Sequence, residues 1–449
     1  MPTVTGIRPP SPWLTILLAV TLLVGCVGLA FVLTKVQPSR HAGTVLNATE
    51  HVLKLESRTD SWEPMANALA VWRGPDHADI YKKVFFAPVE KFQYPPAALF
   101  FAMGLEMGPD FGGIPFETWT LLLSLITLAG CTSFILDRLL AKRGFGAASP
   151  AERALRLVLS VGLLITFYPF AHGFEIGQAQ IWIDALFALG LAAWVAQRRL
   201  LSGVLIGMAC LIKPQLAMLL IWALLRKEWR FAAGLAGFGV IAAVVSLAYF
   251  GLENHFGYLR ALSYLSQHGG SLYANQSVNG LLGRLVSIGD PEHYNNLIWM
   301  ESLPPYHPLI YFGTLISSIL ILLPALFVRS GSNSAERSLD FCTVALSATM
   351  ASPMAWDHHY GVIFPIYAVA LAAAWGRPIY LWALGASYVV ASQYIPGTGK
   401  FAYSALNIVQ SYLFFAAILL LALLYRLRSV IARQGRQGVP NRVVSAAMA

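Results

Sequence analysis

Long apolar runs recur through the whole chain and constrain its fold more than any other feature. Hydrophobic residues make up 57% of the 449 residues and charged residues only 12%, about half the charged share of an ordinary soluble domain. A helix of about 17 to 25 apolar residues crosses the hydrocarbon layer of a bilayer. The clearest runs cover residues 13–34, 116–136, 155–170, 181–196, 231–250, 308–328, 339–351, 361–375, 379–391 and 405–424. The sequence therefore predicts an all-α polytopic membrane protein.

Two further apolar stretches need separate interpretation. The stretch 200–225 is interrupted at Lys213 and Pro214, and because proline kinks or ends a helix, we expect two short helices that meet there. The stretch 95–107 is expected to lie in the outer interface without crossing, since a crossing would invert every later loop. Together the runs predict about 12 transmembrane helices.

The basic residues indicate how the chain is oriented. The net charge is +9, and with a cytoplasmic N-terminus 19 of the 31 Lys and Arg residues fall on the cytoplasmic side, as the positive-inside rule requires. We therefore expect a cytoplasmic N-terminus at 1–12, a membrane domain at 13–428 and a basic cytoplasmic tail at 429–449. Large external loops are expected at 36–93 and 251–306. The predicted location is the inner (plasma) membrane.

Four short polar segments fall on the external side of this arrangement, at residues 58–62, 177–180, 273–277 and 352–359. We find no nucleotide-binding glycine loop and no soluble catalytic domain in the sequence, so chemistry is expected at the helix ends and external loops. The four cysteines all lie within apolar runs, which favours buried thiols over disulfides or metal ligands.

Asp60, Gln178 and Gln180 could form the polar part of a site. Asp60 follows the first apolar run and could accept a proton from a substrate hydroxyl, although an ordinary solvated aspartate fits the same spacing. Gln178 and Gln180 begin a helix near the outer surface, where their amides suit sugar hydroxyls. Helix capping and bonds between helices are the alternative for both glutamines.

Lys213, His358 and His359 supply the remaining ionisable groups. An ammonium inside an apolar stretch usually faces a cavity or a partner, so Lys213 could hold a phosphate. Snorkelling to the interface is the alternative. Adjacent histidines point in different directions on a helix, which disfavours a metal site at His358 and His359. One of them could orient a phosphate or sugar, or act as a base in place of Asp60.

These features together resemble glycosyltransferase family 87. The resemblance covers nearly the whole chain from Thr59 to Tyr360 and is carried by short motifs. These are Asp60, Trp72-Arg73-Gly74, Ile80-Tyr81, Tyr94-Pro95-Pro96, Gly177-Gln178-Ala179-Gln180, Ile212-Lys213-Pro214, Asn275-Gln276-Ser277, and Ser352-Pro353 with Trp356, His358 and His359. The family implies a GT-C fold with a catalytic first external loop. Its best understood members are mannosyltransferases that use a polyprenyl-phosphate sugar.

The resemblance implies an inverting transferase that moves a sugar, mannose first, to a lipid or glycan acceptor at the extracytoplasmic face. Asp60 would be the general base, and no metal or cofactor is implied. The substrate-binding residues would be Arg58, Tyr94, Gln178, Gln180, Lys213, Asn275, Gln276, Trp356, His358 and His359. The chain departs from the family pattern at Ser61-Trp62, where Phe or Tyr usually follows the aspartate, and at Gln180, which is commonly Asn.

Two other classes remain open at the level of sequence. A secondary transporter would also have about a dozen helices and an intramembrane charge, but it usually shows internal repeats and sites near the membrane midplane. A non-catalytic lipid-binding protein could keep the same grooves, but it would not need Asp60.

Overall fold

The computed structural model describes residues 12–36, 44–87, 91–108, 114–145, 147–288, 303–328, 331 and 334–437. Within these residues every regular element is a helix, and an isolated antiparallel β-bridge pairs Asn275 with Trp356. The all-α prediction is confirmed. Residues 1–11 of the predicted N-terminal segment 1–12 and the end of the predicted tail, 438–449, lie outside the described residues.

The longer elements follow the apolar runs of the sequence. Their bounds are α1 Pro12–Val36, α6 Phe116–Lys142, α7 Pro150–Ile165, α9 Gln180–Val195, α10 Arg199–Ile212, α12 Trp229–His268, α16 Pro308–Phe327, α17 Ser334–Met350, α18 Ile363–Ala374, α19 Pro378–Ala391 and α20 Tyr412–Gln437.

Shorter helices connect them. They are α2 Val45–Lys54, α3 Trp62–Arg73, α4 Ile80–Val84, η2 Pro96–Ala98, α5 Leu99–Glu106, α8 Tyr168–Glu175, η3 Pro214–Ala217, α11 Met218–Leu225, α13 Val278–Val286, η4 Asp357–Val362, η5 Pro396–Phe401 and η6 Ala405–Ser411.

Five of the described helices are long and apolar enough to cross a bilayer: α1, α6, α12, α16 and the stretch Ala405–Gln434. A sixth crossing results if α7 and α8, which are bent by 66° at their junction, count as one broken span. These helices make the chain an integral membrane protein. The other apolar helices are shorter than a full crossing, so the figure of about 12 spans remains a prediction.

The short helices show that one apolar run need not form one long helix. The run 155–170 becomes α7 and α8, because the chain leaves the helix at Thr166 and Phe167 and Pro169 sits in the first turn of α8. The predicted kink at Lys213 is confirmed, since α10 ends at Ile212 and Pro214 begins η3. The stretch 95–107 forms η2 and α5, which together are too short for a complete crossing, as its interpretation as an interfacial segment requires.

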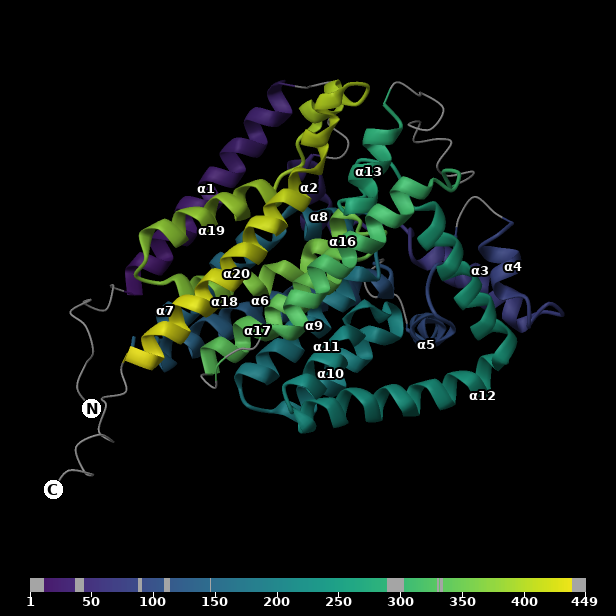
Figure 1. Cartoon of the computed structure of the whole chain (residues 1–449), viewed down its shortest axis with the longest axis horizontal. Helices are drawn as coiled ribbons and strands as arrows, with labels where there is room; N and C mark the ends of the chain where they lie inside the picture. The colour runs from purple at the N-terminus through teal and green to yellow at the C-terminus, as the bar shows by residue number, and fades with distance from the viewer. Residues whose placement is uncertain are drawn as a thin grey trace.

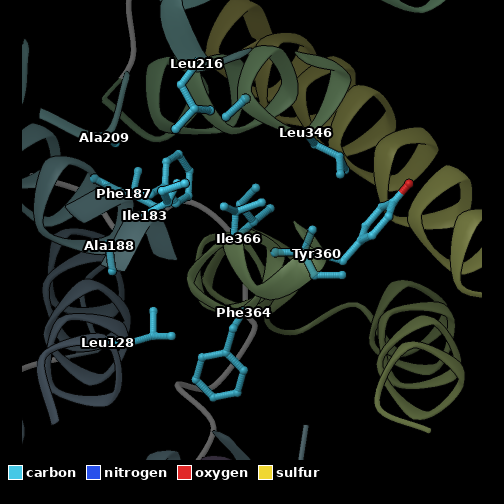
Figure 2. Packing of buried hydrophobic residues seen from close by; sticks show 14 of the residues in the cluster. Leu128, Ile183, Phe187, Ala188, Ala209, Leu216, Leu346, Tyr360, Phe364 and Ile366 are labelled. Carbon is cyan, nitrogen blue, oxygen red and sulfur yellow. The ribbon is translucent and has the colours of Figure 1, made fainter. Parts of the chain in front are cut away.

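Helix α9 lies at the centre of the packing. Most of its side chains are buried, and it packs against α6 and α10. Figure 2 shows Ile183, Phe187 and Ala188 of α9 among buried side chains from neighbouring helices, including Leu346 of α17 and Ile366 of α18. A helix enclosed on all sides holds its side chains in fixed positions, and two polar residues of α9 contribute to the site described below.

The start of α1 and the end of α20 lie on the same side of the bundle. Helix α19 packs against both α1 and α20, and the first turn of α1 and the last turn of α20 point toward the same end of the molecule (Figure 1). Helix α20 continues to Gln437, so the first part of the predicted tail is helical.

The predicted first external loop is largely helical. Between α1 and α6 the chain forms α2, α3, α4, η2 and α5, and α3 and α4 lie beside the second half of α12 (Figure 1). Helix α12 bends at Gly251, which has a φ of 75°, so the predicted second external loop begins as a continuation of this helix.

Candidate active site

Asp60 is exposed and is held by the turn between α8 and α9. The backbone N-H groups of Arg58, Asp60 and Ser61 donate to the carbonyls of Glu175, Ile176 and Gly177 at 2.8, 3.0 and 3.3 Å. Gly177 has a φ of 72°, and a Cβ atom there would lie 1.8 Å from the carbonyl oxygen of Arg58. Only glycine therefore lets the two segments approach this closely.

Ser61 connects the Asp60 segment to the start of α9. Its hydroxyl accepts from the backbone N-H of Ala179 at 2.9 Å, lies 2.7 Å from the Tyr94 hydroxyl and donates to Gln178 Oε1 at 3.1 Å. The Gln178 side-chain amide donates in turn to Asp60 Oδ2. Gln178 thus orients the Asp60 carboxylate, and Ser61 orients Gln178.

Tyr94 is buried between the Asp60 segment and Lys213. Burial raises the pKa of its phenol well above the ordinary value, the hydrogen bond to Ser61 opposes that rise, and the Asp60 carboxylate adds to it. The protonated hydroxyl lies 3.4 Å from Gln178 Oε1, and the aromatic ring lies 5.8 Å from Lys213 Nζ. One side chain therefore contacts both the Asp60 network and the lysine.

Lys213 lies at the end of α10 with its ammonium turned toward α9 and η4. Its Nζ donates to Gln180 Oε1 at 3.2 Å and lies 2.7 Å from His359 Nε2. The Gln180 amide nitrogen donates to Asp184 Oδ1 at 2.9 Å, one turn along α9. Asp60 is also close enough to interact electrostatically with Lys213.

The structure thus brings together six of the residues predicted to form the site. Gln178 bonds to Asp60 and Gln180 bonds to Lys213, and the two glutamines are separated by a single residue. These six residues, called the candidate site below, are Asp60, Tyr94, Gln178, Gln180, Lys213 and His359.

A second chain of ionisable groups lies beside the candidate site. Arg58 Nη2 lies 3.4 Å from Glu175 Oε1, and His172 Nδ1 lies 3.4 Å from Glu175 Oε2. The other nitrogen of His172 is 4.0 Å from Asp357 Oδ2, and His358 Nδ1 is 3.3 Å from Asp357 Oδ1. The predicted residues Arg58 and His358 therefore mark the two ends of one polar chain.

Asn275 and Gln276 are buried, and their amides are used within the protein. Asn275 Nδ2 donates to the carbonyls of Gly270 and Pro353, and Asn275 Oδ1 accepts from Ser277 and from the backbone of Ala355. Gln276 Nε2 donates to two carbonyls, and its Oε1 accepts from the backbone of Phe414.

Together with the bridge between Asn275 and the half-buried Trp356, these bonds hold the segment before η4. That segment carries His358 and His359. The predicted substrate contacts of Asn275, Gln276 and Trp356 remain predictions, while their bonds in the structure position the histidines.

Several functional groups were missed by sequence reasoning. Asp184 and Glu175 are carboxylates within apolar surroundings, which is itself a signal of a site in a membrane protein, and Asp184 stands four residues after Gln180, where helical side chains meet. His172 and the bridging role of Ser61 had no such signal. Within the described residues, no three His, Cys, Asp or Glu side chains are placed to share a metal ion.

Three buried polar atoms around the candidate site have no hydrogen-bond partner in the described structure: Asp184 Oδ2, Asp357 Oδ2 and His358 Nε2. Buried polar atoms normally find partners, so these three are atoms to which a polar ligand could bond. The helical fold defines a membrane-embedded protein, and its helix ends bring polar and ionisable side chains together.

The chain belongs to glycosyltransferase family 87, whose family model matches residues 92–353. It is therefore a glycosyltransferase, as the sequence motifs implied. No solved structure gives a significant match.

Two curated proteins are similar to the chain, and both are named polyprenol-phosphate-mannose-dependent α-(1-2)-phosphatidylinositol mannoside mannosyltransferases. The one from Mycolicibacterium smegmatis is 24% identical over 316 residues, 68% of each chain. The one from Mycobacterium tuberculosis is 25% identical over 294 residues, 64% of this chain and 63% of its own length.

Proposed function

We propose that this protein is an inverting transferase that moves mannose from a polyprenyl-phosphate donor to a hydroxyl of a lipid or glycan acceptor. The observation that carries the proposal is the junction of Asp60 and Lys213 through Gln178, Gln180 and Tyr94. A carboxylate base and a cation for a departing phosphate are the two groups that such a displacement needs. The donor named for both relatives supports the choice of sugar.

Asp60 is suited to the role of general base. Its segment is exposed at the start of α3, and Gln178 fixes its carboxylate. As the acceptor oxygen attacks the anomeric carbon, its proton passes to the Asp60 carboxylate and the bond from that carbon to the phosphate oxygen breaks. Attack from the face opposite the phosphate inverts the anomeric centre, through an oxocarbenium-like transition state.

Lys213 is suited to stabilising the leaving group. The electron pair of the broken bond goes to the polyprenyl phosphate, and a positioned ammonium neutralises the charge that develops there. His359 and Gln180 hold Nζ between them, so the ammonium is already placed before the donor arrives. The lysine supplies the positive charge that the departing phosphate requires.

The substrates fit the surroundings of the candidate site. The polyprenyl tail of the donor is an apolar chain that partitions among membrane helices, while its phosphate and sugar require polar partners. His358 Nε2, which is buried without a hydrogen-bond partner in the described structure, supplies one such partner. Acceptor choice is expected to depend on the exposed surface around Asp60.

The proposed orientation places the candidate site at the extracytoplasmic face. Arg226, Arg337 and Arg428 gather around the ends of α11, α17 and α20, and the end of α11 nearest Arg226 is the one remote from Lys213. Basic residues favour the cytoplasmic side, which leaves Lys213 and Asp60 on the other.

The function is tested with purified full-length protein in lipid nanodiscs, polyprenyl-phosphate mannose labelled in the sugar, and phosphatidylinositol mannoside or a total membrane lipid extract as acceptor. Label in a new glycolipid supports the transferase. Binding of the donor without turnover would point to the non-catalytic protein. Passage of the intact donor across sealed vesicles, again without transfer, would point to a transporter.

The orientation is tested separately with cysteine substitutions at two exposed positions, Glu56→Cys near Asp60 and Arg230→Cys near the start of α12. A membrane-impermeant maleimide added to intact cells should label the first and spare the second. The reverse pattern would place the candidate site on the cytoplasmic side. The variant without either substitution controls for labelling of the native cysteines.

A further inference from the structure

Stability alone does not explain why a carboxyl group, that of Asp184, is buried in the centre of the helix bundle. It lies on α9, the central helix, and is fully buried. Its Oδ1 accepts from Gln180 Nε2 at 2.9 Å, but Oδ2 has no hydrogen-bond partner in the described structure. An apolar side chain of similar size would fill this position without the desolvation penalty of a carboxyl.

The Asp184 carboxyl fixes which end of the Gln180 amide faces Lys213. A glutamine side chain carries an acceptor oxygen at one position and a donor NH₂ group at the other. Because Asp184 Oδ1 takes the NH₂ group, the oxygen is left pointing toward Lys213 Nζ at 3.2 Å. With an apolar residue at 184 the amide loses its anchor and can turn or swing away from the lysine.

Asp184 also contacts the segment that carries the other partner of Lys213. A Cβ atom on Gly361 would lie 1.9 Å from Asp184 Oδ2, and Gly361 follows two residues after His359 in η4. Asp184 therefore lies behind both groups that hold the ammonium, Gln180 on its own helix and the η4 segment across from it.

We propose that Asp184 is a positioning residue of the transferase. Its carboxyl holds Gln180 so that the Gln180 oxygen and His359 together place Lys213 against the departing phosphate. The inference deepens the proposed function and rests on the role given there to Lys213. Asp184 touches no substrate atom in this scheme and acts only through Gln180 and the η4 segment.

The first test measures initial rates of mannose transfer by the full-length protein across donor concentrations, with the lipid extract as acceptor. Asp184→Leu should lower kcat about tenfold or more and leave the donor KM within about threefold, because the lost contact matters most when charge develops on the phosphate. Asp184→Asn keeps an accepting oxygen for Gln180 and should retain activity within about threefold of the parent.

A second variant displaces the Asp184 carboxyl group without substituting Asp184 itself. In Gly361→Ala the added methyl group must displace the Asp184 carboxyl, so we expect a fall in kcat similar to that of Asp184→Leu. Gly239→Ala is the matched control, because a Cβ there meets nothing within 4 Å, and its kcat should equal that of the parent.

A double-mutant cycle separates positioning from a general structural role. If Asp184 acts largely through Gln180, the loss of rate in the double variant with Asp184→Leu and Gln180→Leu should be clearly smaller than the product of the two single losses. Additive losses would overturn the proposal. So would an Asp184→Leu variant whose only change is a lower melting temperature, with an unchanged kcat per folded molecule.

Lys213→Met distinguishes the failure of the inference from the failure of the proposed function. If Lys213→Met transfers mannose at the parent rate, the role proposed for the lysine is wrong and the inference fails with it. If Lys213→Met is slow but Asp184→Leu and Gly361→Ala are as fast as the parent, the proposed function stands and only the role of Asp184 is wrong.

Discussion

The protein places charged groups in two regions at opposite ends of η3 and α11, and the two are bonded differently. At one end Lys213 belongs to the candidate site. At the other, roughly 20 Å along the helix axis, Asp340 of α17 is enclosed by Trp222, Arg226 and Arg428, called the Asp340 cluster here. Both regions are polar groups inside a largely apolar bundle.

Every oxygen of Asp340 is used. Oδ2 accepts from Trp222 Nε1 and Arg226 Nε, both at 2.8 Å. Oδ1 accepts from Arg226 Nη2 at 3.4 Å and forms an ion pair with Arg428 Nη2 at 2.8 Å. The arginines also donate to the carbonyls at the end of α16. One nitrogen of Arg428 lacks a hydrogen-bond partner in the described structure, but both oxygens of the Asp340 carboxylate have partners.

The surroundings of the candidate site, by contrast, contain polar atoms that form no hydrogen bond. Asp184 Oδ2, Asp357 Oδ2 and His358 Nε2 are buried and have no hydrogen-bond partner in the part of the chain that the structure describes. A network whose members satisfy one another holds helices together, whereas unused donors and acceptors can bond to a ligand. We therefore expect the Asp340 cluster to serve stability and the candidate site to serve function. Two opposite mutational outcomes test this expectation.

The largest effect is expected at Asp60. Asp60→Asn keeps an oxygen that can accept from Gln178 but removes the base, so transfer should fall by about 10²- to 10⁴-fold. The melting temperature should not change, because the side chain is exposed. The measurement is the initial rate of mannose transfer, paired with thermal unfolding in the same nanodiscs.

Glu63→Gln is the matched control for Asp60→Asn, since Glu63 is also an exposed carboxylate in the same segment. Its rate should stay near that of the parent. Rapid turnover by Asp60→Asn would remove Asp60 from the mechanism and leave His358 or His359 as the base.

The converse result is expected at Asp340. Asp340→Leu removes the partner of the buried Arg428 and of the partly buried Arg226, and breaking a buried ion pair typically destabilises a protein by about 3 to 5 kcal/mol. The midpoint of unfolding should fall, while the rate per folded molecule stays close to that of the parent. A variant that unfolds normally but no longer transfers mannose would break the division between the two regions.

The sequence anticipated the residues whose chemistry is unusual for their surroundings. Lys213 in an apolar stretch and Asp60 after the first run were both identified as candidates from their type and position, and the structure places them in one network. The break at Pro214 followed from proline geometry alone. The membrane class was equally accessible because it depends only on composition and apolar run length.

Other features depend on contacts that no local pattern encodes. The substrate contacts of Asn275 and Gln276 stay predictions, whereas the bonds from their amides to carbonyls of distant segments such as Pro353 and Gln410 could not be predicted. Ser61 bonds to both Tyr94 and α9, and the local sequence does not predict this role for a serine in a loop. The number of complete spans was equally inaccessible, because a helix can break inside an apolar run when packing satisfies its free ends.

An intermediate effect is expected at Gly177, where one substitution should lower both stability and the transfer rate. In Gly177→Ala the Cβ atom meets the Arg58 carbonyl, and a non-glycine residue in a left-handed conformation costs about 1 to 3 kcal/mol. The strain should also displace the Asp60 segment, and a shift of about 1 Å at a catalytic group can lower the rate about 10²-fold. Both the melting temperature and kcat are therefore expected to fall.

Gly237→Ala is the control for Gly177→Ala, because a Cβ at Gly237 meets nothing within 4 Å. A loss of stability without a loss of rate in Gly177→Ala would show that Asp60 does not depend on the close approach between residues 58 and 177.

The smallest effect is expected at an ion pair that belongs to neither region. Arg73 of α3 and Glu106 of α5 meet in a two-point contact of 3.1 and 2.6 Å, and both side chains are about half exposed. Exposed ion pairs contribute little, because water screens the charges and the long side chains lose freedom when they pair. Arg73→Ala should therefore leave both the melting temperature and the transfer rate at the values of the parent. A clear loss of stability would mean that surface charges hold the segment between α1 and α6 in place, and burial would then no longer separate the two regions. A loss of rate alone would extend the functional region from Asp60 to the far end of α3, where an acceptor headgroup could reach.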